Sequence, residues 1–464
     1  MGTGVFVILA RLLEPKSFGL LAMAAVVINF MDVFLRQGLG QAIVQRKDLE
    51  PGHLDTAFWI NVGSAGLLAF LAFAGAGLCA ALFREPDLAP VVRWLSVGLL
   101  IGGLNATPQA ILARDMAFKS LAIRSLLAVG GGGIVGITMA VCGYGVWSLV
   151  GQHLTAAGIG TVVLWRASGF RPGLNVSRKH ARELFSFGAF VMGIDVLAFV
   201  AMRVDVLMLA YFLTAVEVGV YEVAFRLLRT MTKVLTQTIS AVALSTFSRI
   251  QHDRAQLRSA YLTATQMTAV VAFPAFVGVA VLAPDLVHVL FGPKWEASIT
   301  PMRVLSFVGM LYAVFYCNEP VVLACGKPAW RFLLALIQAV VQVIAVAIAV
   351  RWGVIGVAAA FVIRVYLLAP LSVVVLRRLI NLHWGELAAR LSLPLGAALV
   401  MAGCVWLVRS LSVGIAPLPA SLGLCIIAGV AVYAVTLRVL APSLIVYVGH
   451  LLREGLSRQR VGKG

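Results

Sequence analysis

Long apolar runs separated by short polar loops constrain this chain more than any other feature of its sequence. They lie at residues 2–13, 19–35, 57–82, 91–112, 121–142, 146–165, 185–213, 218–246, 259–283, 300–324, 332–350, 354–376, 391–408 and 418–437. Every run except the first is long enough to cross a hydrocarbon core of about 30 Å as a helix. The sequence therefore predicts an all-α polytopic membrane protein with about fourteen transmembrane helices. The run at 2–13 would reach only about 18 Å, so we expect that the front of the first span is cut off.

The basic residues predict the orientation of these helices. The chain is 61% hydrophobic and only 12% charged, yet its formal net charge is +18. Most Lys and Arg residues fall in alternate loops, and the loops on the other side hold only Lys16, Arg84, Arg93, Lys294, Arg351 and Arg409. Because cytoplasmic loops are enriched in Lys and Arg, both termini are predicted to be cytoplasmic. Anionic lipid headgroups, and not nucleic acid, are the expected partners of this charge.

The loops and cysteines give no sign of an enzyme. The longest predicted external loop runs roughly over residues 284–298, whereas a membrane glycosyltransferase, polymerase or ligase usually needs a larger one. The six cysteines lie in or at the ends of apolar runs and form no CxxC pair, so neither a disulfide framework nor a zinc site is indicated. We expect no catalytic residue, no metal and no cofactor.

The second half of the chain repeats the first at an offset of roughly 200–212 residues. The matched segments are LEPKSFGL with LTAVEVGV (13–20, 213–220), VVRWLSVG with PMRVLSFVG (91–98, 301–309), NATPQAILA with CNEPVVLA (105–113, 317–324) and YGVWSLVG with WGVIGVAA (144–151, 352–359). An even number of spans separates equivalent positions, so the halves share an orientation and an axis along the membrane normal. We predict six-helix bundles at 1–170 and 171–380, two further helices at 381–440 and a basic tail at 441–464.

The repeat pairs two prolines, Pro108 and Pro320, each inside an apolar run. A proline within a helix frees a backbone carbonyl and permits a kink. Two interpretations stay open, a gating hinge and a static kink.

One predicted helix, at residues 221–240, carries a row of charged and polar side chains. An arc of roughly 80° holds Glu222, Arg226, Arg229, Lys233, Gln237 and Ser240. With Arg203 of the preceding run, these cations would cost on the order of 10 kcal/mol if they faced lipid. We expect them to line a wet cavity that attracts an anion. The alternative is an amphipathic helix on the membrane surface.

Further charges inside the apolar runs complete the predicted cavity. At an offset of 200 the first half offers Asn29 and Asp32 opposite the cationic row. Arg203 and Asp205 should point about 160° apart on a regular helix, so no simple ion pair is expected between them. The remaining candidates, which either line the cavity or pair structurally, are Arg303, Glu319 and Arg364.

Five stretches make the chain resemble the polysaccharide-transport, or Wzx-like, flippases of the multidrug/oligosaccharidyl-lipid/polysaccharide exporter superfamily. They are ARLLEPKSFGL (10–20), GLGQAIVQRKDL (38–49), GYGVWSL (143–149), LFGPKW (290–295) and GKP (326–328). The resemblance implies a MATE-like fold in the bacterial inner membrane, with two six-helix bundles facing a central cavity and extra helices. It also implies alternating-access transfer of an undecaprenyl-pyrophosphate-linked oligosaccharide for exopolysaccharide or O-antigen biosynthesis. Polysaccharide polymerase and chain-length machinery are the implied protein partners.

Two other functions stay open at this point. A cation-coupled multidrug antiporter of the same superfamily would need acidic groups in its cavity, and here basic groups outnumber them. A non-transporting partner of a glycan-synthesis complex would have an inert cavity.

Overall fold

The computed structural model describes residues 2–36, 39–45, 50–177, 196, 199–200, 202–412 and 417–440. The regular secondary structure of these residues is entirely helical. Nine described stretches are long and apolar enough to cross a membrane, and one of them, Pro328–Ile380, contains two long helices. The predicted all-α polytopic membrane fold is therefore confirmed. The predicted basic tail at 441–464 lies outside the described residues.

Contacts divide the chain into two compact units. The first unit comprises Met1–Val223 and Gln342–Val354, and the second comprises Ala224–Val341 and Ile355–Gly464. These units follow contacts and not the repeat, and each of their three boundaries falls inside a helix. The bundle limits predicted near residues 170 and 380 stay a prediction.

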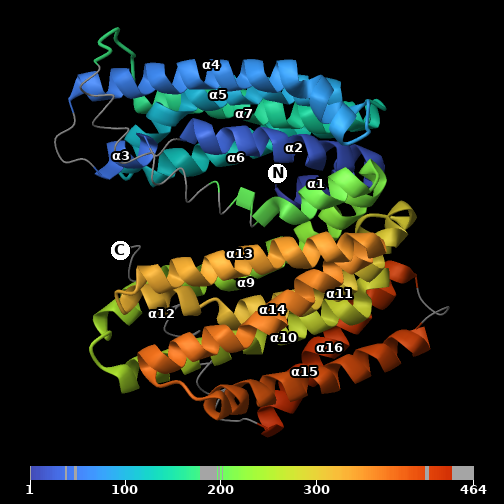
Figure 1. Ribbon diagram of the computed structural model, residues 1–464. Coiled ribbons are helices and arrows are strands. Elements are labelled where there is room, and N and C mark those ends of the chain that lie inside the picture. Colours follow the sequence, from blue (N-terminus) through green and yellow to red (C-terminus); the bar gives the residue numbers. More distant parts are fainter. Residues whose placement is uncertain are drawn as a thin grey trace, which may run out of the picture. The chain divides into compact units, whose positions relative to one another are not determined.

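Seven helices make up most of the first unit. They are α1 (Thr3–Leu12), α2 (Pro15–Arg36), α3 (Leu39–Gln45), α4 (Pro51–Leu82), α5 (Leu88–Arg114), α6 (Phe118–Val141) and α7 (Val146–Ser168). α5 packs against α4, α2 and α7, and α7 packs against α6 (Figure 1). The helical residues 202–212 and the first turns of α9 (Ala215–Arg249) also belong to this unit.

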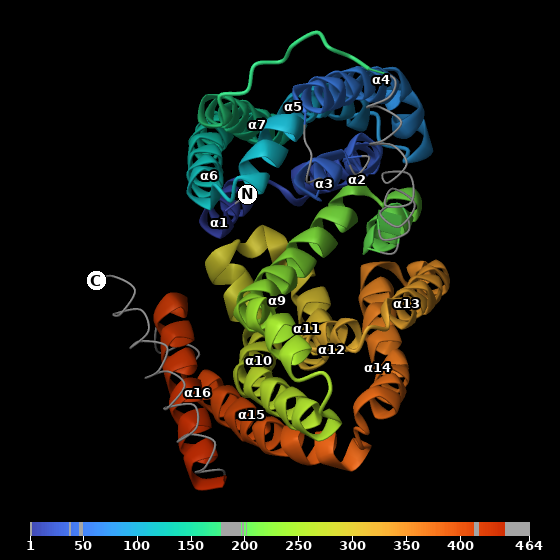
Figure 2. The same ribbon diagram turned by 90° about the vertical axis from the view of Figure 1, so that its left-hand side faces the viewer.

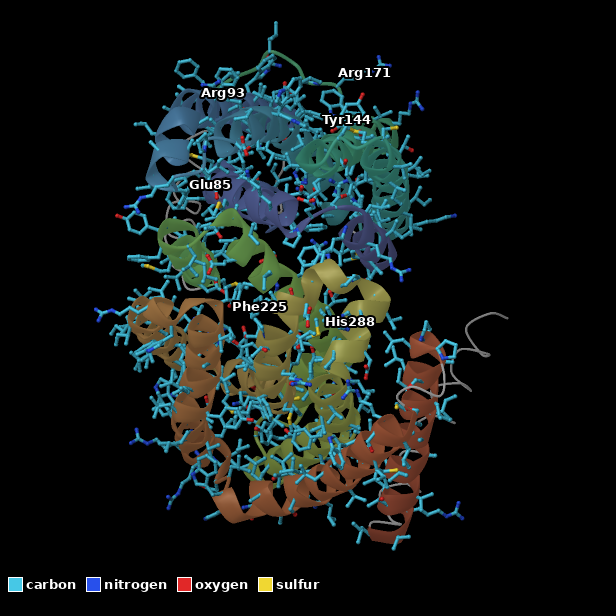
Figure 3. The ribbon with its side chains drawn as sticks, turned by 90° about the vertical axis from the view of Figure 1, so that its right-hand side faces the viewer. Glu85, Arg93, Tyr144, Arg171, Phe225 and His288 are labelled. Carbon is cyan, nitrogen blue, oxygen red and sulfur yellow. The ribbon has the colours of Figure 1, made fainter. Side chains whose placement is uncertain are left out.

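Two glycines let α2 and the start of α9 cross with their backbones in contact. A Cβ added to Gly19 would lie 1.6 Å from the carbonyl oxygen of Ala215, and one added to Gly219 would lie 2.0 Å from that of Pro15. The contact is reciprocal, because each glycine meets the residue four positions before the other. The four residues are related by the offset of 200 found in the sequence repeat. Nearby, the amide of Ala215 donates to the Glu85 carboxylate at 3.0 Å, and Figure 3 labels Glu85.

The second unit contains the rest of α9 and the helices that follow it. These are α10 (Arg254–Leu290), α11 (Ile299–Phe315), α12 (Asn318–Ala324), α13 (Pro328–Ala349), α14 (Gly353–Ile380), α15 (Trp384–Ser412) and α16 (Leu418–Leu440), and α13 is shared with the first unit. A buried apolar cluster around Tyr261 and Phe247 joins α9, α10, α12, α14 and α15. This cluster packs the C-terminal half of α9 against these four helices.

α10 packs against α11 on one side and against α15 and α16 on another (Figure 2). The guanidinium of Arg409 on α15 forms two hydrogen bonds to the Asp285 carboxylate on α10. The hydroxyl of Tyr433 on α16 donates to the carbonyl of Val270 at 2.8 Å. Polar contacts therefore attach the two C-terminal helices to α10 at separate points along its length.

We expect Asp285→Asn to lower the stability of the protein by about 1–2 kcal/mol, because Arg409 then keeps its charge in a partly buried site without a counter-ion. The thermal unfolding midpoint of the purified protein in detergent measures this loss. Asp87→Asn is the matched control, since the Lys16–Asp87 ion pair is exposed on both sides. Equal midpoint shifts for the two variants would contradict the prediction.

The two prolines of the predicted hinge pair lie in different settings. Pro108 is inside α5, as predicted. Pro320 is in the first turn of α12, because the span that holds it is broken between α11 and α12. A proline in the first helical turn removes no internal hydrogen bond. The two positions are thus not equivalent kinks, and a gating role for either one stays a prediction.

Candidate functional site

One face of α9 forms a wall of a pocket in the second unit. The pocket has a volume of about 470 Å³. From α9 it is lined by Phe225, Leu228, Arg229, Thr232, Lys233 and Thr236. These positions are three or four residues apart, so they share one side of the helix. Tyr312 of α11 and Tyr316, which follows the last residue of that helix, also line the pocket.

Two cations and a hydroxyl group make the α9 wall suited to an anion. The guanidinium carbon of Arg229 lies 4.8 Å from the ring centroid of Phe225, which Figure 3 labels. Stacking of this kind fixes the plane of the guanidinium against the ring. Lys233 is exposed. The buried Thr232 hydroxyl has no hydrogen-bond partner among the described residues, and it could donate a hydrogen bond to an anionic oxygen.

A third cation, Arg364, contacts one of the two tyrosines that line the pocket. Arg364 of α14 is 8% exposed, and its Nη2 donates to the Tyr312 hydroxyl at 2.9 Å. Its guanidinium carbon lies 4.8 Å from the centroid of the Phe361 ring. That ring meets Phe225 edge-on at 5.3 Å and Tyr312 at 6.1 Å between centroids. The rings of Phe225 and Phe361 therefore link Arg229, which lines the pocket, to Arg364.

The structure brings together only part of the predicted cationic row. Arg229 and Lys233 line the pocket, as the sequence predicts, but Arg226 is half-buried and is not among the residues that line it. The face of α9 that lines the pocket shares Arg229 and Lys233 with the predicted arc, and it also includes Phe225 and Thr232. For Gln237 the backbone is helical, and its side chain lies outside the described residues.

Arg203 and Asp205 make contacts of their own in the first unit. Arg203 approaches the carboxylate of Glu222 at 4.0 Å. Asp205 is 2% exposed and accepts a hydrogen bond from the hydroxyl of Tyr221 at 2.7 Å. The two residues have different partners, in agreement with their predicted orientations. The structure therefore gives both of them structural contacts, and a role in substrate binding stays a prediction.

The other candidates are spread over both units. Arg303 is exposed on α11, and Glu319 is exposed and forms an ion pair with Arg331 at 3.0 Å. In the first unit, Asn29 is exposed and Asp32 is half-buried, both on α2. Arg364 contacts a residue that lines the pocket, Tyr312.

The aromatic residues of the site were not predicted. A row of charges in an apolar helix is conspicuous, whereas an aromatic side chain in a membrane span is ordinary. Tyr312 and Tyr316 are four residues apart, which places both on one side of a helix, and this spacing is the signal that could have pointed to them. The described residues contain no group of three or more His, Cys, Asp or Glu side chains placed to hold a metal ion.

Comparison with known sequences gives consistent matches. Residues 8–300 match the family model described as "Polysaccharide biosynthesis protein". The succinoglycan biosynthesis transport protein ExoT of Rhizobium meliloti is 29% identical over 73% of this chain and 69% of its own length. The lipopolysaccharide biosynthesis protein WzxC of Escherichia coli is 26% identical over 68% of this chain and 64% of its own. The teichuronic acid biosynthesis protein TuaB of Bacillus subtilis is 25% identical over 65% of this chain and 63% of its own length. The matches thus span roughly two thirds of these relatives.

Comparison with solved structures identifies the fold. The lipid II flippase MurJ in an inward closed conformation superposes with a TM-score of 0.77, over 95% of this chain and 97% of that one, at 15% identity. An inward-facing multidrug resistance MATE family transporter of the MOP superfamily gives a TM-score of 0.64, over 82% and 96%, at 16% identity. At these identities the likeness concerns the fold alone, and it agrees with the MATE-like architecture expected from the sequence.

Proposed function

Because this chain belongs to the polysaccharide biosynthesis protein family, we propose that it moves a lipid-linked oligosaccharide across the membrane. The family match agrees with the resemblance to Wzx-like flippases noted in the sequence. The observation that carries the proposal is the pocket in the second unit, where Arg229, Lys233 and the Thr232 hydroxyl meet beside two tyrosines. The curated relatives have names that refer to succinoglycan, lipopolysaccharide and teichuronic acid, all of them polysaccharides or glycolipids.

The pocket chemistry suits a diphosphate headgroup. A diphosphate entering an apolar region loses hydration, which is costly unless hydrogen bonds and charges replace it. The forked N–H groups of Arg229 bind phosphate oxygens in pairs, and Lys233 adds a mobile point charge. In this proposal the sugars stay in a wet cavity and the polyprenyl tail stays in lipid. The cations thus lower the barrier by replacing part of the lost water.

The cellular setting is part of the proposal. The protein acts in the bacterial inner membrane with both termini in the cytoplasm, and it moves the substrate from the inner to the outer leaflet by alternating access. It carries out no covalent chemistry, and polysaccharide polymerase and chain-length proteins act next on the product. The basic loops, which alternate with loops poor in Lys and Arg, support this orientation.

A cation-coupled drug antiporter is the competing function, and the pocket disfavours it. The side chains that line the described pocket include two cations and no carboxylate. A cationic drug would meet like charge there, which disfavours binding. Export of a cationic dye from cells that produce the protein should therefore equal export from cells without it.

The deciding experiment measures the leaflet in which the glycan resides. In spheroplasts of a deletion strain, we expect the lipid-linked oligosaccharide to be inaccessible to an impermeant glycosidase added outside. The wild-type gene should restore access. If the oligosaccharide is equally accessible with and without the gene, this chain is not the translocator. If pocket variants restore access as well as the wild type does, this pocket does not bind the substrate, and the pocket gives no support for transport over a non-transporting role.

A further inference from the structure

We propose that a second, smaller pocket, at one end of the first unit, binds a single sugar ring of the glycan. This pocket has a volume of about 190 Å³ and lies where α2, α5 and α7 begin. The residues that carry the argument are Glu14, Lys16, Ser17, Leu20, Asp87 and Trp147. The inference rests on the proposed function, because it gives the sugar part of the same substrate a site apart from the headgroup pocket.

The starts of three helices bring these residues together. Glu14 directly precedes α2, Asp87 is the N-cap residue of α5, and Trp147 is in the first turn of α7. The start of α7 adjoins that of α2, since a Cβ added to Gly145 would lie 3.9 Å from the Ser17 hydroxyl oxygen. Gly145 has a φ of 55°, a conformation that favours glycine. Helix ends, and not long loops, therefore form this pocket.

The charges of the pocket disfavour an ionic ligand. Lys16 and Asp87 form an ion pair, with 2.6 Å between the ammonium nitrogen and a carboxylate oxygen, so the carboxylate of Glu14 is the excess charge. An anion would meet two carboxylates and one cation, which disfavours its binding. A divalent metal ion needs several oxygen ligands, whereas the described residues contain no group of three or more His, Cys, Asp or Glu side chains placed to hold one. The charges thus favour a neutral, polar ligand.

Three polar groups of the lining are available to such a ligand. They are the Glu14 carboxylate, the Ser17 hydroxyl and the Trp147 indole N–H, and none of them has a hydrogen bond to another described residue. A carboxylate accepts, an indole N–H donates and a hydroxyl does both. Neighbouring hydroxyl groups of a sugar offer the matching donors and acceptors. The bond to the carboxylate should be the strongest of the three, because it is charge-assisted.

The apolar part of the lining suits the face of a sugar ring. Leu20 is buried, as is Val91, which also lines the pocket, and the larger Trp147 is half-buried. Ligand sites generally combine apolar surface of this kind with a few placed polar groups. Tryptophan provides both in one side chain, a flat apolar surface and a polar N–H. A sugar has the same division, with C–H groups on its ring faces and hydroxyl groups around its edge.

The side of the membrane gives this pocket a place in the transport step. Lys16 belongs to a loop that the distribution of Lys and Arg predicts to be external. In the proposed direction of transport, a sugar ring bound there belongs to a glycan that has already crossed. Binding at this point stabilises the glycan on the outer side and so favours the completed step.

The test measures binding of the free oligosaccharide, without lipid or diphosphate. The probe is the repeat unit, released by partial acid hydrolysis from the surface polysaccharide of the producing strain. Full-length protein is reconstituted in nanodiscs of zwitterionic lipid with EDTA, because alkyl glycoside detergents would compete for a sugar site. A titration followed by saturation-transfer-difference NMR gives the affinity and identifies the sugar protons that contact the protein.

Two variants remove the proposed contacts, and each has a matched control. Glu14→Gln should weaken binding about five- to tenfold, because glutamine keeps an acceptor but loses the charge. Trp147→Leu should weaken it roughly tenfold, because both the ring and the N–H are lost. The controls are Trp94→Leu and Glu296→Gln, which change an exposed tryptophan and an exposed carboxylate outside the lining. Both controls should bind like the wild type.

Four outcomes would overturn the inference. Unchanged affinity in Trp147→Leu or in Glu14→Gln removes a proposed contact. A wild-type protein without saturation transfer at millimolar oligosaccharide has no such site, and equal losses in the control variants indicate adsorption elsewhere. If Trp147→Leu fails to fold, Glu14→Gln decides alone, since Glu14 is exposed.

The spheroplast assay keeps this inference apart from the proposed function. If the wild-type gene restores access of the glycosidase but the free oligosaccharide does not bind, only this inference fails. If binding depends on Trp147 while access does not depend on the gene, the pocket is a sugar site and the proposed function fails. Arg229→Gln should leave binding of the free oligosaccharide unchanged, because this probe carries no diphosphate.

Discussion

Export of the glycan is expected to fall at least about 100-fold when Arg229 and Lys233 are both replaced by glutamine, since each loses a charged contact of about 1.5–3 kcal/mol to the headgroup. The two residues are the cations that line the described pocket. Glutamine is polar and uncharged and has an unbranched stem like those of arginine and lysine, so insertion and folding should be preserved. Export is measured as surface polysaccharide in a deletion strain that carries the variant gene, with protein levels matched by immunoblot.

The control for this experiment removes two positive charges from elsewhere. Arg171→Gln combined with Arg249→Gln lowers the net charge equally, and both side chains are exposed outside the pocket. We expect that double variant to export normally. Arg226→Gln should have a smaller effect than Arg229→Gln, because Arg226 is not among the pocket residues. Wild-type export by the Arg229, Lys233 variant would refute the assignment of this pocket to the substrate.

The second large effect is expected at the crossing of α2 and α9. Gly219→Ala places a methyl group 2.0 Å from the Pro15 carbonyl oxygen, and Gly19→Ala places one 1.6 Å from that of Ala215. The obstacle is backbone on both sides, so no side chain can rotate out of the way. We expect each variant to lose about 3 kcal/mol of stability or more, the upper range for overpacking. Fluorescence-detected size exclusion after a temperature series gives the loss of folded protein.

Gly63→Ala is the matched control for the crossing, because an added Cβ there meets nothing within 4 Å. Replacing glycine by alanine inside a helix is otherwise favourable by about 1 kcal/mol, so this control should be slightly stabilised. The losses from the two crossing variants should not add, since both disrupt one contact. A stable Gly19→Ala protein would show that α2 can move away from α9 at little cost.

The sequence predicted the class of fold because the bilayer leaves few alternatives. A long apolar run must be a helix whose backbone groups bond internally, whatever its neighbours are. The repeat was equally informative, since the match of residues 13–20 with 213–220 corresponds to a physical contact between Gly19 and Gly219. Helix ends were harder to predict. The span around Pro320 is broken into α11 and α12, which its hydropathy does not reveal.

The site was predicted only in part, and the missing part has a physical cause. Helical periodicity places charged residues on a shared arc, but packing decides which edge of that arc opens on a pocket. Arg229 and Lys233 line the pocket, whereas Arg226, on the same predicted arc, does not. Arg364 and Tyr312 are 52 residues apart in sequence. Their contact depends on how α14 lies against α11, and no local pattern encodes that.

The reciprocal glycine contact has a consequence for the history of this chain. Duplication of an ancestral gene would have produced two copies with identical crossings, and each copy would then have met the main chain of the other. A substitution in one copy at that point is resisted by atoms that no compensating mutation can remove. Elsewhere the copies could diverge, since Arg226, Arg229 and Lys233 of α9 correspond to Val26, Asn29 and Val33 of the first copy. The duplicated protein could thus acquire a row of cations in one half only, while the backbone contact at Gly19 and Gly219 disfavours any larger residue at either position.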